Sequence, residues 1–494
     1  MSKKTPIFYS ALLLTCVNLI LRMVSTSFQV YISGRIGAAG VGLLQLVLSV
    51  GGMAMTAAMA GIRTATMYLT AGELGRRKPE NVRHVLSVCV TYSILCSSVV
   101  AAALYLLSPT AAIYWIGDER TTEAIRLFAC VIPVSCLCGV MTGYFTAAGR
   151  IKTLAAVEVA EQLCSMAATL AALSLWAKDD PGKACQAVVL GSGIGGCITL
   201  TVLTVLRLLE HAPKGSPIPL KKRLLDIALP LALADDLKTG INTTENLMVP
   251  KRLSLYPHAA DPLAVFGTVC GMVFPVLMFP AAIVFSLAEL LIPEMARCNA
   301  AGSRIRIQYL ARRSLRIVLL YGCIAGGILY LAGTPICLWL YDSPDAGRHL
   351  VLYAFLAPML YCDAIIDAMN KGLGQQKICV RYNILTAALD VLFLFLLLPK
   401  FGMTGYFISF LVTHLLNFIL SLKLLIRTAG LQLTIKPPLK VGLSVAISVV
   451  LCSIVTDPVF RIAAFFLIFP SLLTLMGVLS KQDIFWVKGL IKKR

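Results

Sequence analysis

What the chain most lacks is charge. Only 14% of its 494 residues are Asp, Glu, Lys or Arg, whereas a soluble domain needs roughly a quarter to cover its surface. With 58% hydrophobic residues and a mean hydropathy of +0.83, the chain cannot fold as a soluble globule. We therefore predict an all-α polytopic membrane protein.

Motifs for catalysis and nucleotide binding are also missing. The sequence contains no GxxxxGK[ST], HExxH or GxSxG motif, and its five histidines are dispersed, which argues against ATP hydrolysis, zinc-dependent hydrolysis and serine-hydrolase chemistry. The sixteen cysteines form no CxxC pair and lie mostly in apolar runs. We therefore interpret them as small hydrophobic residues of the spans. We predict that the chain is not an enzyme and has no cofactor or metal.

Long apolar runs are what the sequence has in abundance. Windows of about 20 apolar residues predict fourteen transmembrane helices. The first run follows a short basic start, but it exceeds signal-peptide length, so we expect it to be retained as a span. The predicted spans lie near residues 7–33, 41–66, 84–107, 122–147, 153–176, 184–209, 224–249, 263–292, 314–340, 346–370, 380–399, 402–426, 438–456 and 459–480.

The net charge of +20 is unevenly distributed. Lys and Arg gather in alternate connecting segments, such as residues 72–84 and 297–316, while the other segments are short and mildly acidic. This is the positive-inside pattern. It predicts a multi-pass protein of the cytoplasmic membrane with both termini in the cytoplasm, and it explains the basic balance without nucleic acid. The external segments are too short to hold a catalytic domain.

The chain also contains a weak internal repeat. GRIKTLAAVEVAEQ begins at Gly149 and GQQKICVRYNILTA begins at Gly374, 225 residues later. Both segments fall at the same junction of a six-helix unit, and two such units around a central cavity are common in transporters. We predict an N-terminal lobe (residues 1–215), a C-terminal lobe (216–430), and an additional helix pair with a basic cytoplasmic tail (431–494).

Within the first run, ALLLTCVNLILRMVSTSFQVYISG, Arg22 lies near the middle. A charge at that depth costs about 3 kcal/mol or more and normally faces a bundle interior or a water-filled cavity. The nearest helix ends are roughly 16 Å away, too far for easy snorkelling. Asn18, Arg22 and Gln29 share one helical face, so we predict that this face is exposed to water.

Further polar residues form stripes on other predicted spans, as expected if several helices enclose an aqueous cavity. Asp235 and Lys238 are spaced for an ion pair, so a purely structural role for this pair stays open. The predicted cavity residues that bind substrate are Arg22, Asn18, Gln29, Arg63, Lys238, Asn242 and Glu245, and the candidate ion-coupling residues are Asp235, Asp236 and Glu158.

Three runs resemble a known family: RMVSTSFQVYISGRIGAAGVGLLQLVLSVGGMAMTAAMAGIRTATMYLTAGE, IALPLALADDLKTGINTTENLMVPKRL and GMVFPVLMFPAAIVFSLAELLIPEMA. They are similar to the polysaccharide exporters that include stage V sporulation protein B. That family is part of the multidrug/oligosaccharidyl-lipid/polysaccharide (MOP) flippase superfamily and is related to lipid II flippases. The similarity extends over nearly the whole chain, including the plan of twelve helices plus two.

The resemblance implies a function. Such a protein would flip an undecaprenyl-diphosphate-linked oligosaccharide or peptidoglycan precursor across the cytoplasmic membrane by alternating access, as a monomer among membrane lipids, in sporulation or cell-wall synthesis. In the related lipid II flippases, cavity arginines are thought to meet the diphosphate. Arg22 matches that role, whereas Arg63 cannot be matched residue for residue.

Two other functions compete with flipping. One is a cation-coupled multidrug exporter of the same superfamily, in which the acidic groups would bind the drug or the driving ion. The other is a membrane glycosyltransferase or polymerase, which the short external loops disfavour. It also stays open whether Arg22 meets the substrate or is neutralised by Glu245 or Asp235.

Overall fold

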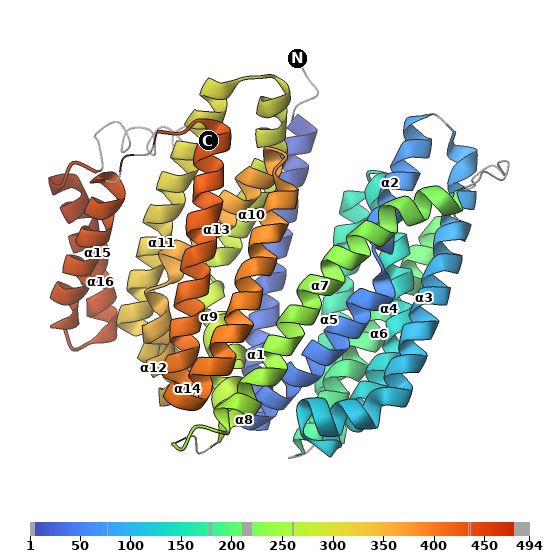
Figure 1. Ribbon diagram of the computed structural model, residues 1–494, viewed down its shortest axis with the longest axis horizontal. Coiled ribbons are helices and arrows are strands. Elements are labelled where there is room, and N and C mark those ends of the chain that lie inside the picture. The colour runs from blue at the N-terminus through green and yellow to red at the C-terminus, as the bar shows by residue number, and fades with distance from the viewer. Residues whose placement is uncertain are drawn as a thin grey trace. The chain divides into compact units, whose positions relative to one another are not determined.

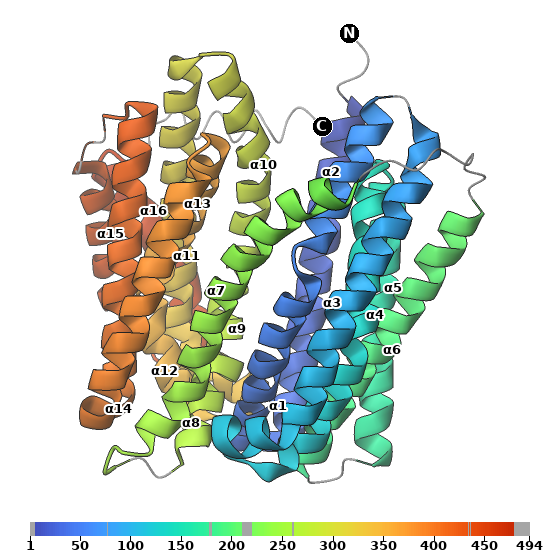
Figure 2. The same cartoon turned by 45° about the vertical axis from the view of Figure 1, so that its right-hand side comes forward.

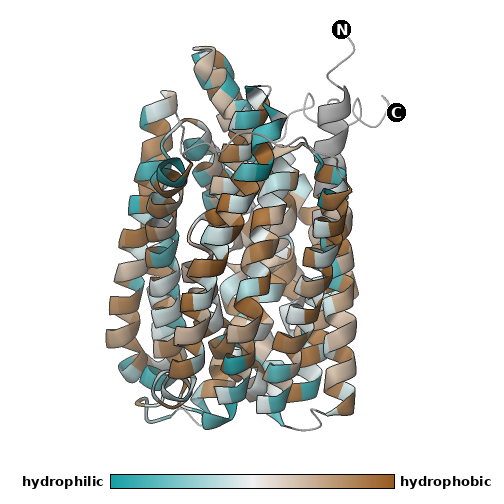
Figure 3. Cartoon of the chain, turned by 90° about the vertical axis from the view of Figure 1, so that its right-hand side faces the viewer, coloured by the Kyte–Doolittle hydropathy of each residue, from teal (hydrophilic) through white to brown (hydrophobic). Residues whose placement is uncertain are grey.

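A computed structural model describes residues 5–76, 78–176, 180–209, 220–258, 261–432, 434 and 436–478. The predicted basic tail lies outside these residues. The described chain is helical almost throughout and contains no strand, which confirms the all-α fold. Hydrophobic residues run along the middle of the helices, and hydrophilic residues are more frequent toward their ends (Figure 3).

The helices follow one another with short connections (Figure 1). The first seven are α1 (Thr5–Met59), α2 (Ile62–Gly75), α3 (Val82–Thr110), α4 (Thr122–Ala147), α5 (Ile151–Leu175), α6 (Pro181–Leu208) and α7 (Lys221–Leu253). The others are α8 (Pro262–Gly267), α9 (Phe274–Met278), α10 (Ala281–Ala300), α11 (Arg304–Tyr341), α12 (Pro344–Ala354), α13 (Ala357–Gly372), α14 (Gln376–Ala429), α15 (Lys436–Ser453) and α16 (Pro458–Leu475). Short turns are η1 (Pro79–Asn81) and η3 (Glu119–Thr121), and π-helical segments are η2 (Ala111–Ile116) and η4 (Thr268–Val273).

Nine helices in the described part of the chain are long and apolar enough to cross a membrane, and two further bent helix pairs pass the same test together. The longest, α1 and α14, each consist of two helices joined at a glycine with non-helical dihedral angles, Gly37 and Gly402. Each of the fourteen predicted spans falls mostly on helical residues. The chain is therefore a multi-pass membrane protein.

Three of the predicted spans are not single straight helices in the structure. The second breaks at Ala60 and Gly61, whose φ angles are 42° and 69°. A Cβ at Gly61 would lie 2.6 Å from the carbonyl oxygen of Ala228, so the missing side chain lets α7 approach the break. The eighth bends by 62° between α9 and α10, next to Pro280, and the tenth bends by 58° between α12 and α13.

The chain divides into two compact units. Unit 1 contains residues 1–267 and 391–403, and unit 2 contains residues 268–390 and 404–494. This grouping by contacts places α7 with the first six helices. The predicted lobes rest instead on the sequence repeat, and their boundaries stay a prediction.

Unit 1 is built on a bundle in which α3, α4, α5 and α6 run side by side (Figure 2). Its core joins α2, α3, α4 and α6 through buried residues such as Ile62, Val85, Phe145 and Leu203. Glycine brings α5 and α6 close together, because a Cβ at Gly191 would meet the Thr169 hydroxyl at 2.0 Å.

In unit 2, α11 packs against α12 and α13 and also against the last two helices. Figure 1 shows α15 and α16 beside α11. The contact is apolar and includes Cys323 and Leu331 of α11 with Phe465 and Phe469 of α16.

Matching turns support the predicted 225-residue repeat. Gly149 and Gly374 both have positive φ, 73° and 83°, which suits a residue without a side chain. In both turns, the amide after this glycine donates a hydrogen bond to the carbonyl oxygen five residues earlier. Arg150 N donates to Phe145 O, and Gln375 N donates to Asn370 O. The turns after α2 and α10 repeat this pattern with the bonds Lys78 N to Glu73 O and Ser303 N to Cys298 O. The register predicted from the sequence therefore holds at two separate junctions.

Candidate functional site

Arg22 lies within α1, and its side chain is exposed on the protein. Its backbone carbonyl accepts a hydrogen bond of 2.9 Å from Thr26 Oγ1. Among the described residues, no carboxylate forms an ion pair with its guanidinium, so neither Glu245 nor Asp235 neutralises it. Its five N–H donors remain available to an anion.

Asn18 and Gln29 were predicted to share the face of α1 that carries Arg22. The side chain of Asn18 lies outside the described part of the structure, and Gln29 is half-buried and already engaged in an interaction. The placement of these two residues in a binding site stays a prediction.

Arg63, near the start of α2, lies close enough to Glu158 of α5 for the two charges to interact. Helix α4 positions it: a Cβ at Gly143 would lie 2.5 Å from the carbonyl oxygen of Arg63, and Gly139 faces the Arg63 side chain. Two glycines on α4 thus allow α2 to approach. The structure brings together a predicted substrate residue and a predicted ion-coupling residue.

A second carboxylate follows on the same face of α5. Glu161 accepts a hydrogen bond of 2.7 Å from Thr199 Oγ1 of α6 and interacts electrostatically with Glu158. The partner threonine comes from another helix, so the sequence spacing on α5 alone could not identify the pair.

The polar residues of α7 are mostly exposed. Asp235, Lys238 and Asn242 are exposed, and no ion pair joins Asp235 to Lys238 in the described structure. The structural ion pair left open by the sequence is therefore not formed between these two described residues. Glu245 is half-buried and has an interaction of its own.

Asp236 differs from its neighbours on α7. It is half-buried, and its Oδ1 is fully covered yet has no hydrogen-bond partner among the described residues. Its charge also interacts with the Tyr92 hydroxyl of α3. A covered carboxylate oxygen without a donor is unfavourable, so Asp236 is suited to binding a proton or a small cation.

Two hydrogen bonds fix α7 against the second half of α1. Thr243 Oγ1 donates to Ser49 O at 3.1 Å, and Asn246 Nδ2 donates to Ser49 Oγ at 2.9 Å. Interhelical bonds of this kind are typically worth about 0.6 kcal/mol each in membranes. They set the rotation of α7 and hence the direction of its polar stripe.

Unit 2 contains a polar cluster that the predicted site did not include. Asn417 of α14 donates a hydrogen bond of 2.9 Å to Asp363 of α13, and Lys371 pairs with Asp367 at 2.6 Å. Four covered oxygens there have no donor in the described structure: Asp363 Oδ1, Asp367 Oδ1, Asn370 Oδ1 and Asn417 Oδ1. Carboxylate and amide oxygens are the donors that hard cations prefer, although no group of three or more metal-ligating side chains occurs among the described residues.

Another buried carboxylate in unit 2 is fully satisfied. Asp390 accepts hydrogen bonds from the hydroxyls of Ser409 and Thr413, the latter at 3.2 Å. These donors lie about five helical turns further along α14, beyond its kink. The tertiary pairing, and not the local sequence, reveals the role of Asp390 in joining the two halves of α14.

Outside the spans, the turn between η2 and α4 has its own charge pair. Asp118 accepts hydrogen bonds from Arg120 Nε and Nη2 and from the Arg120 amide, which caps η3. The Arg120 guanidinium holds the pKa of Asp118 below its usual value.

Comparison with known proteins shows which fold the chain shares. Residues 15–170 match the MatE family model. An inward-facing MATE family multidrug resistance transporter of the MOP superfamily superposes with a TM-score of 0.68 at 13% identity, covering 84% of this chain and 98% of that chain. The fold is that of the multi-pass transporters of the MOP superfamily, and the predicted resemblance is confirmed.

Two relatives extend this similarity over most of the chain. Stage V sporulation protein B of Bacillus subtilis (strain 168) is 20% identical over 477 residues, which are 94% of this chain and 91% of that protein. The lipid II flippase MurJ in an inward closed conformation superposes with a TM-score of 0.70 at 12% identity, covering 94% of this chain and 98% of that chain.

Proposed function

We propose that this chain flips a lipid-linked anionic sugar across the cytoplasmic membrane by alternating access. The substrate class is an undecaprenyl-diphosphate-linked oligosaccharide or peptidoglycan precursor, such as one used in sporulation or cell-wall synthesis. The chain works as a monomer with both termini in the cytoplasm, and it carries out no covalent chemistry.

One observation carries this proposal: Arg22 is an exposed cation in a membrane-length helix, with no carboxylate partner among the described residues. An unpaired guanidinium at that depth is expensive, and a diphosphate that binds it by charge-assisted, bidentate hydrogen bonds offsets the expense. Arg63 is a weaker candidate for the same role, because its charge is already shared with Glu158.

The physics of the substrate agrees with this role. A charged sugar head cannot cross about 30 Å of hydrocarbon unaided, whereas its tail can stay in lipid throughout. An inside-negative potential favours outward movement of an anion by about 2.3 kcal/mol per charge per 100 mV. Nucleotide hydrolysis is therefore unnecessary.

The experiment is a translocation assay in proteoliposomes. The probe is a fluorescent polyprenyl-diphosphate disaccharide, whose exposure on the outer leaflet is measured by chemical quenching. We expect translocation that depends on the protein and that excess polyprenyl diphosphate, but not polyprenol, competes away. Failure of all diphosphate lipids to move or bind would contradict the proposal.

A second candidate is a cation-coupled multidrug exporter. The covered, unpaired carboxylate oxygens of Asp236 and Asp363 favour it, because such groups bind protons or Na⁺ readily. The same proteoliposomes decide between the two: efflux of a cationic dye driven by an imposed Na⁺ or proton gradient, without diphosphate-lipid binding, would favour the drug exporter.

A further inference from the structure

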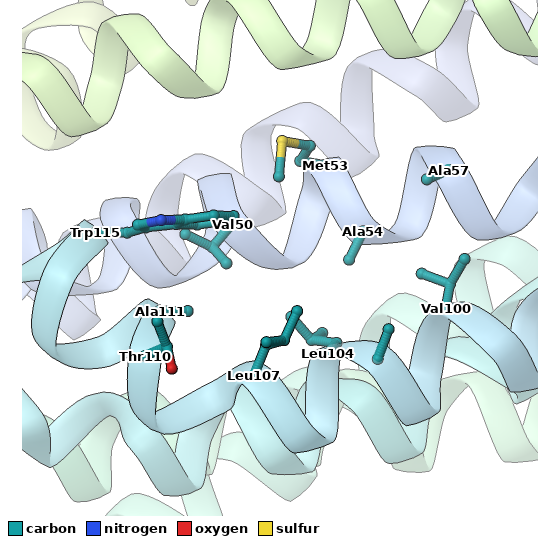
Figure 4. Close-up of a pocket in the computed structure, with 11 residues that line it drawn as sticks. Val50, Met53, Ala54, Ala57, Val100, Leu104, Leu107, Thr110, Ala111 and Trp115 are labelled. Carbon is teal, nitrogen blue, oxygen red and sulfur yellow. The ribbon is translucent and has the colours of Figure 1, made fainter.

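Unit 1 contains an apolar groove of about 240 Å³ between the second half of α1 and α3 (Figure 4). One wall is formed by Val50, Met53, Ala54 and Ala57, and the other by α3 residues from Val100 to Thr110. Trp115 of η2 closes one end. Thr110 is the one polar residue among the eleven that line the groove.

The local sequence explains both the groove and its closed end. Small side chains such as Ala54 and Ala103 leave the space between the two helices. Pro109 lies in the last turn of α3, and the π-helical η2 follows it directly. The wider π-helical turn places Trp115 across the end of the groove, where Figure 4 shows its ring facing Val50.

The groove is reached from the surface of unit 1. Leu107 is 56% exposed and Trp115 is 43% exposed, although both line the groove. Both walls belong to helices of membrane length, so hydrocarbon, and not water, fills such a space. An empty groove would leave its lining without dispersion contacts.

A cation lies at the closed end. Lys251, near the end of α7, donates a hydrogen bond to the carbonyl oxygen of Tyr114, one residue before Trp115. Lys251 is exposed, and no carboxylate pairs with it in the described structure. Tryptophan and tyrosine rings are typical of the membrane–water interface, so this end lies at headgroup depth, where a lysine meets lipid phosphate.

The length of the groove limits what fits into it. The α3 wall covers ten residue steps, about 15 Å at 1.5 Å per residue, which is half of a hydrocarbon core of about 30 Å. That length matches one acyl chain of a single leaflet. A long isoprenoid chain would extend well beyond it.

We infer that this groove binds one acyl chain of an anionic phospholipid, whose phosphate pairs with Lys251 while Trp115 lies at the headgroup boundary. Lipid tails are as apolar as leucine, so close packing of the chain and the charge of the head, not the hydrophobic effect, hold the lipid there. This lipid is separate from the transported substrate, and the inference does not depend on the proposed function.

Photolabelling of the full chain in nanodiscs tests the inference. The probe is phosphatidylglycerol with a diazirine in its acyl chain, and the labelled peptides are mapped by mass spectrometry. We expect label on α1 near Ala54 and on α3 near Leu107.

A groove-filling variant tests the site. Ala103→Phe fills the groove and should lower this labelling roughly tenfold, equivalent to about 1.4 kcal/mol. Ala102→Phe is the matched control, because Ala102 is exposed on the same helix and does not line the groove.

The headgroup is tested separately. Lys251→Gln should lower labelling by phosphatidylglycerol but not by phosphatidylcholine with the same diazirine chain. Lys440→Gln is the control, because Lys440 also donates to a backbone carbonyl, that of Met476 in unit 2.

Three results would overturn the inference or part of it. Unchanged labelling in Ala103→Phe would overturn the assignment of the groove as the binding site. Equal labelling of the wild type by both headgroups would overturn the preference for an anionic lipid. Stronger labelling by a diazirine polyprenyl diphosphate than by phosphatidylglycerol would replace the phospholipid with an isoprenoid occupant.

Discussion

Arg22 and Arg63 have the same charge but different surroundings. Arg22 has no carboxylate partner among the described residues, whereas Arg63 interacts with the charge of Glu158. These surroundings favour Arg22 over Arg63 for the proposed anion-binding role. Sequence spacing identified both arginines, and the three-dimensional neighbours distinguish their surroundings.

A double-mutant cycle tests the structural role of Arg63. Arg63→Ala should lower stability by about 0.5–1 kcal/mol, the range of partly exposed ion pairs, because it leaves the Glu158 charge uncompensated. Arg63→Ala combined with Glu158→Gln should recover most of this loss. Thermal unfolding in detergent measures the effect. Strictly additive single and double mutants would show that the two charges do not interact.

The Asp118 turn supplies a pH-dependent prediction. The folded pKa of Asp118 is lowered by Arg120, so its contribution to stability is complete above the unfolded pKa of about 3.9 and is lost as the pH falls through the folded value. Asp118→Ala should cost about 1 kcal/mol at neutral pH through loss of the cap and should flatten the acid dependence of the unfolding midpoint.

The control for the Asp118 prediction is Glu119→Ala, at an exposed neighbour in the same turn. It should leave the midpoint and its pH dependence unchanged. Equal effects of the two substitutions would show that the pair of Asp118 and Arg120 does not stabilise the turn.

At the scale of helices, a glycine on α4, Gly143, permits the close packing of α2 against α4. A Cβ at Gly143 would meet the backbone oxygen of Arg63 at 2.5 Å, and backbone cannot move aside as a flexible side chain can. Gly143→Ala should therefore destabilise unit 1 by about 1–3 kcal/mol.

A second glycine provides the contrast in the same thermal-unfolding measurement. Gly72 is helical in α2, and a Cβ added there would have nothing within 4 Å. Gly72→Ala should be neutral or stabilising by up to about 1 kcal/mol. A destabilisation by Gly72→Ala as large as that by Gly143→Ala would contradict the close-packing argument.

Two tyrosines support the bend between α9 and α10. Tyr361 Oη donates to Leu277 O at 2.7 Å, and Tyr321 Oη donates to Pro280 O at 2.8 Å. These carbonyls lie at a break in the helix, where the regular backbone ladder is interrupted. Side chains from α13 and α11 thus stabilise the 62° bend.

Removal of one hydroxyl tests this support. Tyr361 is 1% exposed, so Tyr361→Phe should cost about 1–2 kcal/mol by leaving the Leu277 carbonyl unsatisfied. Tyr330→Phe, at a 44% exposed tyrosine of α11, is the control and should have no effect on thermal unfolding. A neutral Tyr361→Phe would mean that the bend does not need the hydroxyl.

For the whole molecule, the apolar runs were enough to predict the fold class and the helix positions. Window hydropathy depends only on local composition, so it located the spans but not the break at Gly61. At this break, Ala228 of another helix approaches the glycine closely. The repeat register was predictable at one pair of junctions because both turns place a glycine, Gly149 and Gly374, at the same position.

The candidate site was only partly predictable. Helical spacing predicted a stripe on α1, which stays a prediction, and it selected Glu158 of α5 and Asp236 of α7, whose neighbours the structure describes. It could not find partners contributed by distant segments, such as Asn417 for Asp363, 54 residues away. It also suggested a pair of Asp235 and Lys238 that does not form in the described structure, because spacing along a helix permits contact without enforcing it.

The central claim is that Arg22, which has no carboxylate partner in the described part of the chain, binds the diphosphate of the substrate. The most direct measurement is translocation of a polyprenyl-diphosphate disaccharide in proteoliposomes that contain wild type, Arg22→Ala, Arg22→Lys or Arg35→Ala. We expect Arg22→Ala to abolish translocation and Arg22→Lys to retain part of it, because lysine keeps the charge without the bidentate geometry. Arg35→Ala is the control, since its guanidinium stacks on Tyr31 of the same helix, and it should stay near wild type. Wild-type translocation by correctly inserted Arg22→Ala would contradict the account.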